Sequence, residues 1–162
     1  MPQARHLRAE AAAFGLIVAL ALSGCQPPLS DSQTQVVEGV QFDYGVVKSD
    51  VVLGHPPNHP ERAMHEGVPT GFDIYHVVLA LRDAKAGTRI RDTDVSLAVS
   101  GPGHPGHVLV ALTPMGPADV LTYGGYVSLP AEGKYRLTFD VARAGQRRRA
   151  ARARFLFQRP SG

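Results

Sequence analysis

This 162-residue sequence contains one cysteine and no tryptophan. A single cysteine excludes an intrachain disulfide, so a folded domain must depend on its hydrophobic core. Charge is nearly balanced, with 17 Lys and Arg against 14 Asp and Glu, which argues against a nucleic-acid-binding polycation. The sequence also lacks a Gly-rich phosphate loop and a Gly-x-Ser-x-Gly nucleophile motif. We therefore expect neither a nucleic-acid partner nor an enzyme.

A long apolar run occurs at the N-terminus, over residues 11–22, and it is shorter than the roughly 20 residues of a spanning helix. Arg5 and Arg8 precede it, which is typical of a secretory signal peptide. The run ends in Leu22-Ser23-Gly24-Cys25, which resembles the lipobox of bacterial lipoproteins. That resemblance implies a signal peptide over residues 1–24 and a membrane anchor of palmitate-type lipid on Cys25.

This anchor predicts an extracytoplasmic location in the cell envelope, on the periplasmic side in a Gram-negative cell. Gln26 after the cysteine favours the outer membrane. Residues 25–35 are rich in Pro, Ser, Asp and Gln and predict a flexible tether. One domain should then span residues 36–160, because hydrophobic alternation begins there.

Short runs with a period of two, separated by turn signals, indicate strands throughout this domain. The best example is Tyr135–Val141, in which every second residue is apolar. Val51–Leu53 is expected to extend a strand or to begin a short one. No helical periodicity follows the signal peptide, so we predict an all-β fold. It should be an antiparallel immunoglobulin-like β-sandwich of seven or eight strands, with an eight-stranded barrel as the alternative.

Two strands carry further signals. Gly124 and Gly125 lie inside a strand pattern and predict a bulge or a close backbone approach. The segment Gly133-Lys134-Tyr135 resembles the tyrosine corner of immunoglobulin-like sandwiches, in which a Tyr at the start of a late strand anchors the preceding turn.

The segment His55–Glu66 concentrates possible metal ligands, with three His, one Met and two Glu among its twelve residues. Its three prolines forbid a helix and predict a stiff exposed loop. His76 lies in the apolar strand 72–81, where a buried imidazole needs a hydrogen bond or an ion. Mixed His and Met ligands favour copper, whereas zinc would use His55, His59, His65 and Glu66 alone. The candidate metal ligands are His55, His59, His65, Glu66, His76 and Met115.

A family resemblance adds to this list. Leu112–Met115, Thr122-Tyr123-Gly124 and Tyr135–Phe139 resemble segments of the Ig-like periplasmic copper-binding proteins associated with bacterial iron uptake, over the range Tyr75 to Val141. The resemblance implies that Met115 is the methionine ligand. Thr122 stands where that family has a histidine.

Two functions follow from these patterns. The first is an envelope lipoprotein whose Ig-like domain binds a metal ion, copper favoured and zinc the alternative, for transport support or delivery to an envelope transporter or metalloprotein partner. The second is a lipid-tethered Ig-like protein-interaction module in which the histidines are incidental.

Overall fold

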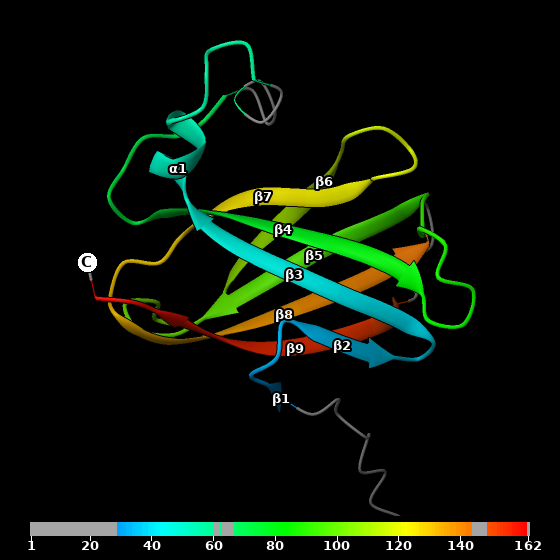
Figure 1. Cartoon of the computed structure of the whole chain (residues 1–162). Coiled ribbons are helices and arrows are strands. Elements are labelled where there is room, and N and C mark those ends of the chain that lie inside the picture. Colours follow the sequence, from blue (N-terminus) through cyan, green and yellow to red (C-terminus); the bar gives the residue numbers. More distant parts are fainter. Residues whose placement is uncertain (1–28, 60–61, 63–66, 144–148, 162) are drawn as a thin grey trace, which may run out of the picture.

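The computed structural model is built mainly of β-strands, which confirms the all-β prediction. It describes residues 29–59, 62, 67–143 and 149–161 (Figure 1). The predicted signal peptide and Cys25 lie outside the described residues. Within the described ranges, no helix is long and apolar enough to cross a bilayer. The elements are β1 (Leu29–Ser30), β2 (Thr34–Val37), β3 (Val40–Lys48), α1 (Ser49–Leu53), β4 (Ile74–Asp83), β5 (Thr93–Ser100), β6 (Val108–Met115), β7 (Thr122–Ser128), β8 (Gly133–Arg143) and β9 (Arg149–Arg159).

The described strands form one sheet in the order β1-β9-β8-β5-β6-β7-β4-β3-β2, which folds over at β6. Residues 108–112 of β6 pair with β5, whereas residues 113–115 pair with β7. This strand therefore leaves one layer of a sandwich and enters the other. Figure 1 shows β3 and β4 lying across β8 and β9. The strand pairs are antiparallel except for the short β1–β9 pair.

The nine described strands exceed the predicted seven or eight because β1 and β2 were not expected. Part of β2 and all of β1 fall within residues 25–35, the predicted tether. The two ends of the sheet also approach each other. Gln35 Oε1 on β2 accepts a hydrogen bond from the Arg154 backbone N–H on β9 at 3.1 Å. The sandwich is thus nearly closed into a barrel, which lies between the two architectures that the sequence predicted.

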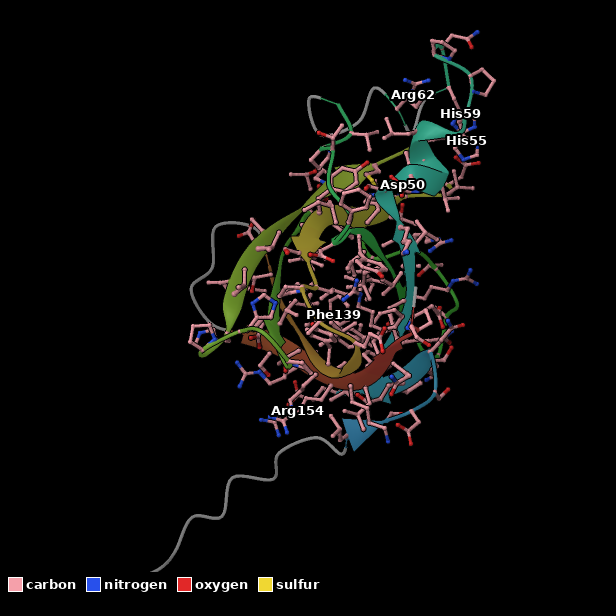
Figure 2. The ribbon with its side chains drawn as sticks, turned by 90° about the vertical axis from the view of Figure 1, so that its left-hand side faces the viewer. Asp50, His55, His59, Arg62, Phe139 and Arg154 are labelled. Atoms are coloured by element: carbon pink, nitrogen blue, oxygen red, sulfur yellow. The ribbon has the colours of Figure 1, made fainter. Side chains whose placement is uncertain are left out.

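The inward faces of the strands fill the space between the two layers. Along β8, Leu137, Phe139 and Val141 are buried and Arg136 is exposed, which confirms the predicted alternation. Phe139 meets Phe155 of β9 edge to face, with ring centroids 5.8 Å apart. Figure 2 shows Phe139 in the middle of the molecule, among the side chains of both layers. Burying such aromatic rings is the main source of stability in a domain without disulfides.

Tyr135 makes the contact predicted for it. Its hydroxyl lies 2.7 Å from the carbonyl oxygens of Pro102 and Ala131 and accepts a hydrogen bond from the Ala131 N–H at 3.0 Å. The ring is fully buried. One side chain therefore fixes the turn before β8 to the loop after β5.

The expectation that Val51–Leu53 is a strand was wrong, because these residues belong to the helix α1. The helical turn buries Val52 to 1% exposure and leaves Val51 57% exposed. Gly54 follows as the C-cap residue. Three consecutive apolar residues carry no periodicity that separates a strand from a helical turn. The choice depends on which of them finds a surface to cover, and here Val52 does.

Candidate metal centre

His76 is placed by the alternation of β4, which lies between β3 and β7 in the sheet. Its neighbours Tyr75 and Val77 belong to the core cluster, so His76 faces the opposite side of the sheet. A residue on that face would ordinarily be solvated, yet His76 is only 2% exposed. A buried imidazole on the outer side of a sheet indicates that this face is covered and that the ring nitrogens have partners.

Tyr126 on β7 is the cross-strand partner of His76. The two rings stack with centroids 4.7 Å apart and an interplanar angle of 28°. Stacking of this kind limits rotation of the imidazole. Tyr126 therefore acts as a positioning residue for His76.

Met115 reaches the same place from the other side of β7. It is the last residue of β6 and pairs in register with Thr122 of β7. Its side chain is 7% exposed and does not belong to the core cluster between the layers. Met115 and His76 therefore share the outer face of the layer formed by β3, β4 and β7.

Gly124 of β7 lies between these two side chains. A Cβ atom at position 124 would lie 2.7 Å from Met115 Sδ and 2.9 Å from His76 Nε2, which is closer than side chains tolerate. The space above Gly124 is thus occupied by a thioether sulfur and an imidazole nitrogen together. The sum of the two distances is the upper limit on the separation of Sδ and Nε2. With metal–ligand bonds of about 2.0–2.3 Å, one ion can join two donors that lie up to roughly 4.6 Å apart, a separation that falls within this limit.

The helix α1 contacts both β3 and β4. Ser49 and Val52 of the helix are both 1% exposed. The helix follows directly after β3, whose Val47 is the register partner of His76. The segment that begins at His55 therefore starts from an element packed beside the His76 strand.

The structure describes part of the predicted His/Pro loop. His55 and His59 stack on each other, with centroids 4.2 Å apart and planes inclined by 14°. Arg62 Nη1 donates a hydrogen bond to the His55 carbonyl oxygen at 3.0 Å. Figure 2 shows His55, His59 and Arg62 together beyond α1, well away from Phe139. His65 and Glu66, the other predicted loop ligands, lie outside the described residues.

The predicted ligands thus fall into two described groups, His76 with Met115 and His55 with His59. Within residues 29–59, 62, 67–143 and 149–161, no three His, Cys, Asp or Glu side chains are arranged to hold one ion. His55 and His59 therefore do not join His76 as a three-residue group. The described donors of the candidate centre are one imidazole and one thioether.

Sequence reasoning singled out His76, Met115 and a close approach at Gly124, but it missed Tyr126. The sequence did carry one relevant signal: Tyr126 lies two residues after Gly124 on the same strand, so the two residues share a face of the sheet. The register that puts Tyr126 opposite His76 joins strands separated by about fifty residues of chain, and no local pattern reports it.

Comparison with known proteins adds solved structures. No protein-family model matches this sequence, and no curated protein matches it either. The fold is similar to that of FetP from uropathogenic Escherichia coli strain F11, with a TM-score of 0.57 and 12% identity over 80% of this chain and 93% of that chain.

A copper-bound variant of the same FetP gives a TM-score of 0.55 at 13% identity, covering 80% of this chain and 95% of that one. Copper-reconstituted P19 from Campylobacter jejuni also gives 0.55, at 12% identity over 82% and 94% of the two chains. At these identities the likeness establishes a shared fold. The resemblance to copper-binding proteins expected from Tyr75 to Val141 is therefore confirmed at the level of the fold.

Proposed function

We propose that this protein binds copper on the outer face of its β3-β4-β7 layer, through His76 Nε2 and Met115 Sδ. The observation that carries the proposal is the convergence of these two donor atoms above Gly124. A thioether sulfur is a soft ligand that suits Cu(I), and imidazole suits copper in either oxidation state. The copper-bound neighbours FetP and P19 support this choice of metal.

Cu(II) takes a square-planar or tetragonal set of ligands, so His76 and Met115 leave positions open, and the His/Pro loop is the source we propose for the other ligands. The loop leaves α1, which packs against β3 and β4 beside His76. His65 and Glu66 are its candidate ligands for the same ion. Zinc held by His55, His59, His65 and Glu66 is the alternative, but it leaves the pairing of Met115 with His76 without a role.

The role proposed is binding and delivery rather than catalysis. With a signal peptide over residues 1–24 and a lipid on Cys25, the protein would sit at an extracytoplasmic membrane surface. There it would pass copper to an envelope transporter or metalloprotein partner, or hold copper for it.

Isothermal titration with Cu(I), Cu(II) and Zn(II) tests this proposal. Met115→Leu keeps the apolar volume and removes the sulfur, while His76→Phe keeps the stack on Tyr126 and removes the nitrogen. We expect binding of Cu(I) tighter than micromolar, a loss of at least about tenfold in Met115→Leu, and a loss for both copper states in His76→Phe.

His107→Ala is the matched control, because His107 is an exposed histidine outside both groups. His65→Ala, combined with Met115→Ala, tests the loop contribution. No binding tighter than micromolar, or binding unchanged in these variants, would overturn the copper proposal and leave the interaction-module function.

A further inference from the structure

The loop that follows β4 carries two arginines, Arg89 and Arg91, at the end of the strand away from His76. The loop of residues 84–92, which follows β4, folds back on the end of that strand, on the opposite side of Figure 1 from α1. The Asp83 N–H donates to the Thr88 carbonyl at 2.9 Å, and the Ile90 N–H donates to the Leu81 carbonyl at 3.1 Å. Asp83 Oδ1 accepts hydrogen bonds from the N–H groups of Lys85 and Ala86. The loop is thus fixed by its own backbone.

This fold-back places two arginines directly opposite each other. Arg82, near the end of β4, and Arg89, in the loop, form an isolated antiparallel bridge. Like charges at directly opposed positions destabilise a strand pair. Chains ordinarily avoid such a pair or neutralise it with a carboxylate between the two side chains.

Among the described residues, no carboxylate forms an ion pair with Arg82 or Arg89. Arg82 Nε and Arg89 Nη1 are both buried and have no hydrogen-bond partner among the described residues. Asp83 is engaged with the turn, and Asp43 accepts from Thr34 and from Gln41, the β3 neighbour of Arg82. Burying a guanidinium donor without an acceptor costs free energy, so an acceptor other than the described residues is indicated.

The two arginines line a surface cavity of about 470 Å³, a size ordinary for a small-molecule site. Arg91 also lines it, and Asp119 is the one carboxylate among its described lining residues. Three guanidinium groups against one carboxylate leave a surplus of two positive charges. That positive surplus attracts an anion, and the planar fork of arginine suits the oxygens of a phosphoryl group.

We propose that this cavity, lined by Arg82, Arg89 and Arg91, binds a phosphoryl group. The group is either free phosphate or the headgroup of an anionic phospholipid, which share this chemistry. Arg82 lies six residues along β4 from His76, about 20 Å at the rise of a strand, so the site is separate from the copper centre. The proposal does not depend on the copper proposal.

Titration of the full chain with inorganic phosphate tests the free-anion source, with chloride at equal ionic strength as the screen for general charge effects. We expect Arg82→Gln and Arg89→Gln each to weaken phosphate binding by about tenfold or more. Arg136→Gln removes an equal charge from an exposed position on β8 and should leave binding unchanged. Asp119→Asn, which removes the opposing carboxylate, should strengthen it.

Cosedimentation with vesicles tests the headgroup source. The readout is the difference in the fraction of bound protein between phosphatidylcholine vesicles with and without phosphatidylglycerol. This difference is used because any binding through the apolar N-terminal run adds to both fractions. Binding that depends on phosphatidylglycerol and falls in Arg89→Gln supports a headgroup. Phosphate binding that falls in Arg89→Gln supports the free anion.

Melting curves keep the test interpretable if a variant is less well folded. Without phosphate, Arg89→Gln should melt at a higher temperature than the wild type, because the opposed charges are relieved. Phosphate should raise the melting temperature of the wild type but not that of Arg89→Gln. Absence of binding in both arms, or an equal loss in Arg136→Gln and Arg89→Gln, would overturn the proposal.

Discussion

His76 and Met115 meet across β7, a strand to which neither belongs. Their donor atoms lie over Gly124, which is flanked in the sheet by β4 on one side and β6 on the other. Three strands in fixed register therefore set the distance between the imidazole and the thioether. Such a pair is preorganised by the sheet, so forming it around an ion costs little further ordering.

Gly124→Ala should weaken Cu(I) binding by about tenfold or more. The added Cβ would lie 2.7 Å from Met115 Sδ, and the His76 ring cannot easily yield because it stacks on Tyr126. The flexible methionine must move, and overpacking of this kind costs about 1–3 kcal/mol. Titration with Cu(I) measures the effect.

The matched control for this variant is Gly45→Ala on β3. A Cβ at position 45 meets no atom within 4 Å, so copper affinity should stay at the wild-type value. If Gly124→Ala binds copper as tightly as Gly45→Ala does, the donors do not meet over Gly124.

Thr122→His should strengthen copper binding, and Cu(II) more than Cu(I). Thr122 is the register partner of Met115 and stands where the resembling copper-binding family has a histidine. Directly opposed Cβ atoms lie about 4.5–5.5 Å apart, so an imidazole at this position can reach an ion held by Met115. Imidazole is harder than thioether, which favours the oxidised metal.

Titration with both copper states checks the gain. Thr138→His, on β8 in the other layer, adds the same ring away from Met115 and should leave affinity unchanged. A Thr122→His protein that binds copper no more tightly than Thr138→His would argue against Met115 as a ligand.

Strand positions and faces were predictable because they depend on local pattern. Alternation in Tyr135–Val141 identifies the buried face directly. The same period of two puts His76 and its neighbour Tyr75 on opposite faces of the sheet. Register was not predictable, since it depends on which strands become neighbours. The meeting of His76, Tyr126 and Met115 is a consequence of register. The sequence therefore pointed to His76 and Met115, but not to Tyr126 or to the geometry of the three residues.

The smallest elements also escaped prediction for a physical reason. β1 is two residues long and exists through its pairing with Arg154 and Phe155 of β9. The helix α1 is one short turn whose conformation depends on Val52 finding the sheet. Neither has enough residues to show a period of its own, and tertiary contacts decide the outcome.

Tyr135→Phe should lower stability by about 1–2 kcal/mol, because it leaves partly buried backbone groups without their hydrogen-bond partner. The hydroxyl that it removes bonds to groups of Pro102 and Ala131. Urea unfolding measures the loss. A Tyr135→Phe protein as stable as the wild type would show that the turn before β8 is held by other contacts.

Tyr126→Phe, which keeps the ring that stacks on His76, should retain copper binding.

Stability should fall in alkaline solution partly through Tyr44. Burial, and then the nearby charge of Asp31, raises the pKa of Tyr44 above its usual value of 10.0. Above that value the unfolded chain loses the tyrosine proton while the folded chain keeps it, so the unfolded state binds fewer protons. Stability from this group is therefore fully present below pH 10 and falls as the pH rises toward the folded-state pKa.

Tyr44→Phe should make this alkaline loss shallower. The variant removes the ionising hydroxyl, which donates to the Leu156 carbonyl at 3.3 Å, and keeps the ring that packs on Phe155. At about pH 8 the lost hydrogen bond should cost about 1 kcal/mol or less. Above about pH 10, urea unfolding should then show a smaller decline of stability with pH than in the wild type. Equal declines in the two proteins would mean that Tyr44 ionises alike in the folded and unfolded chains.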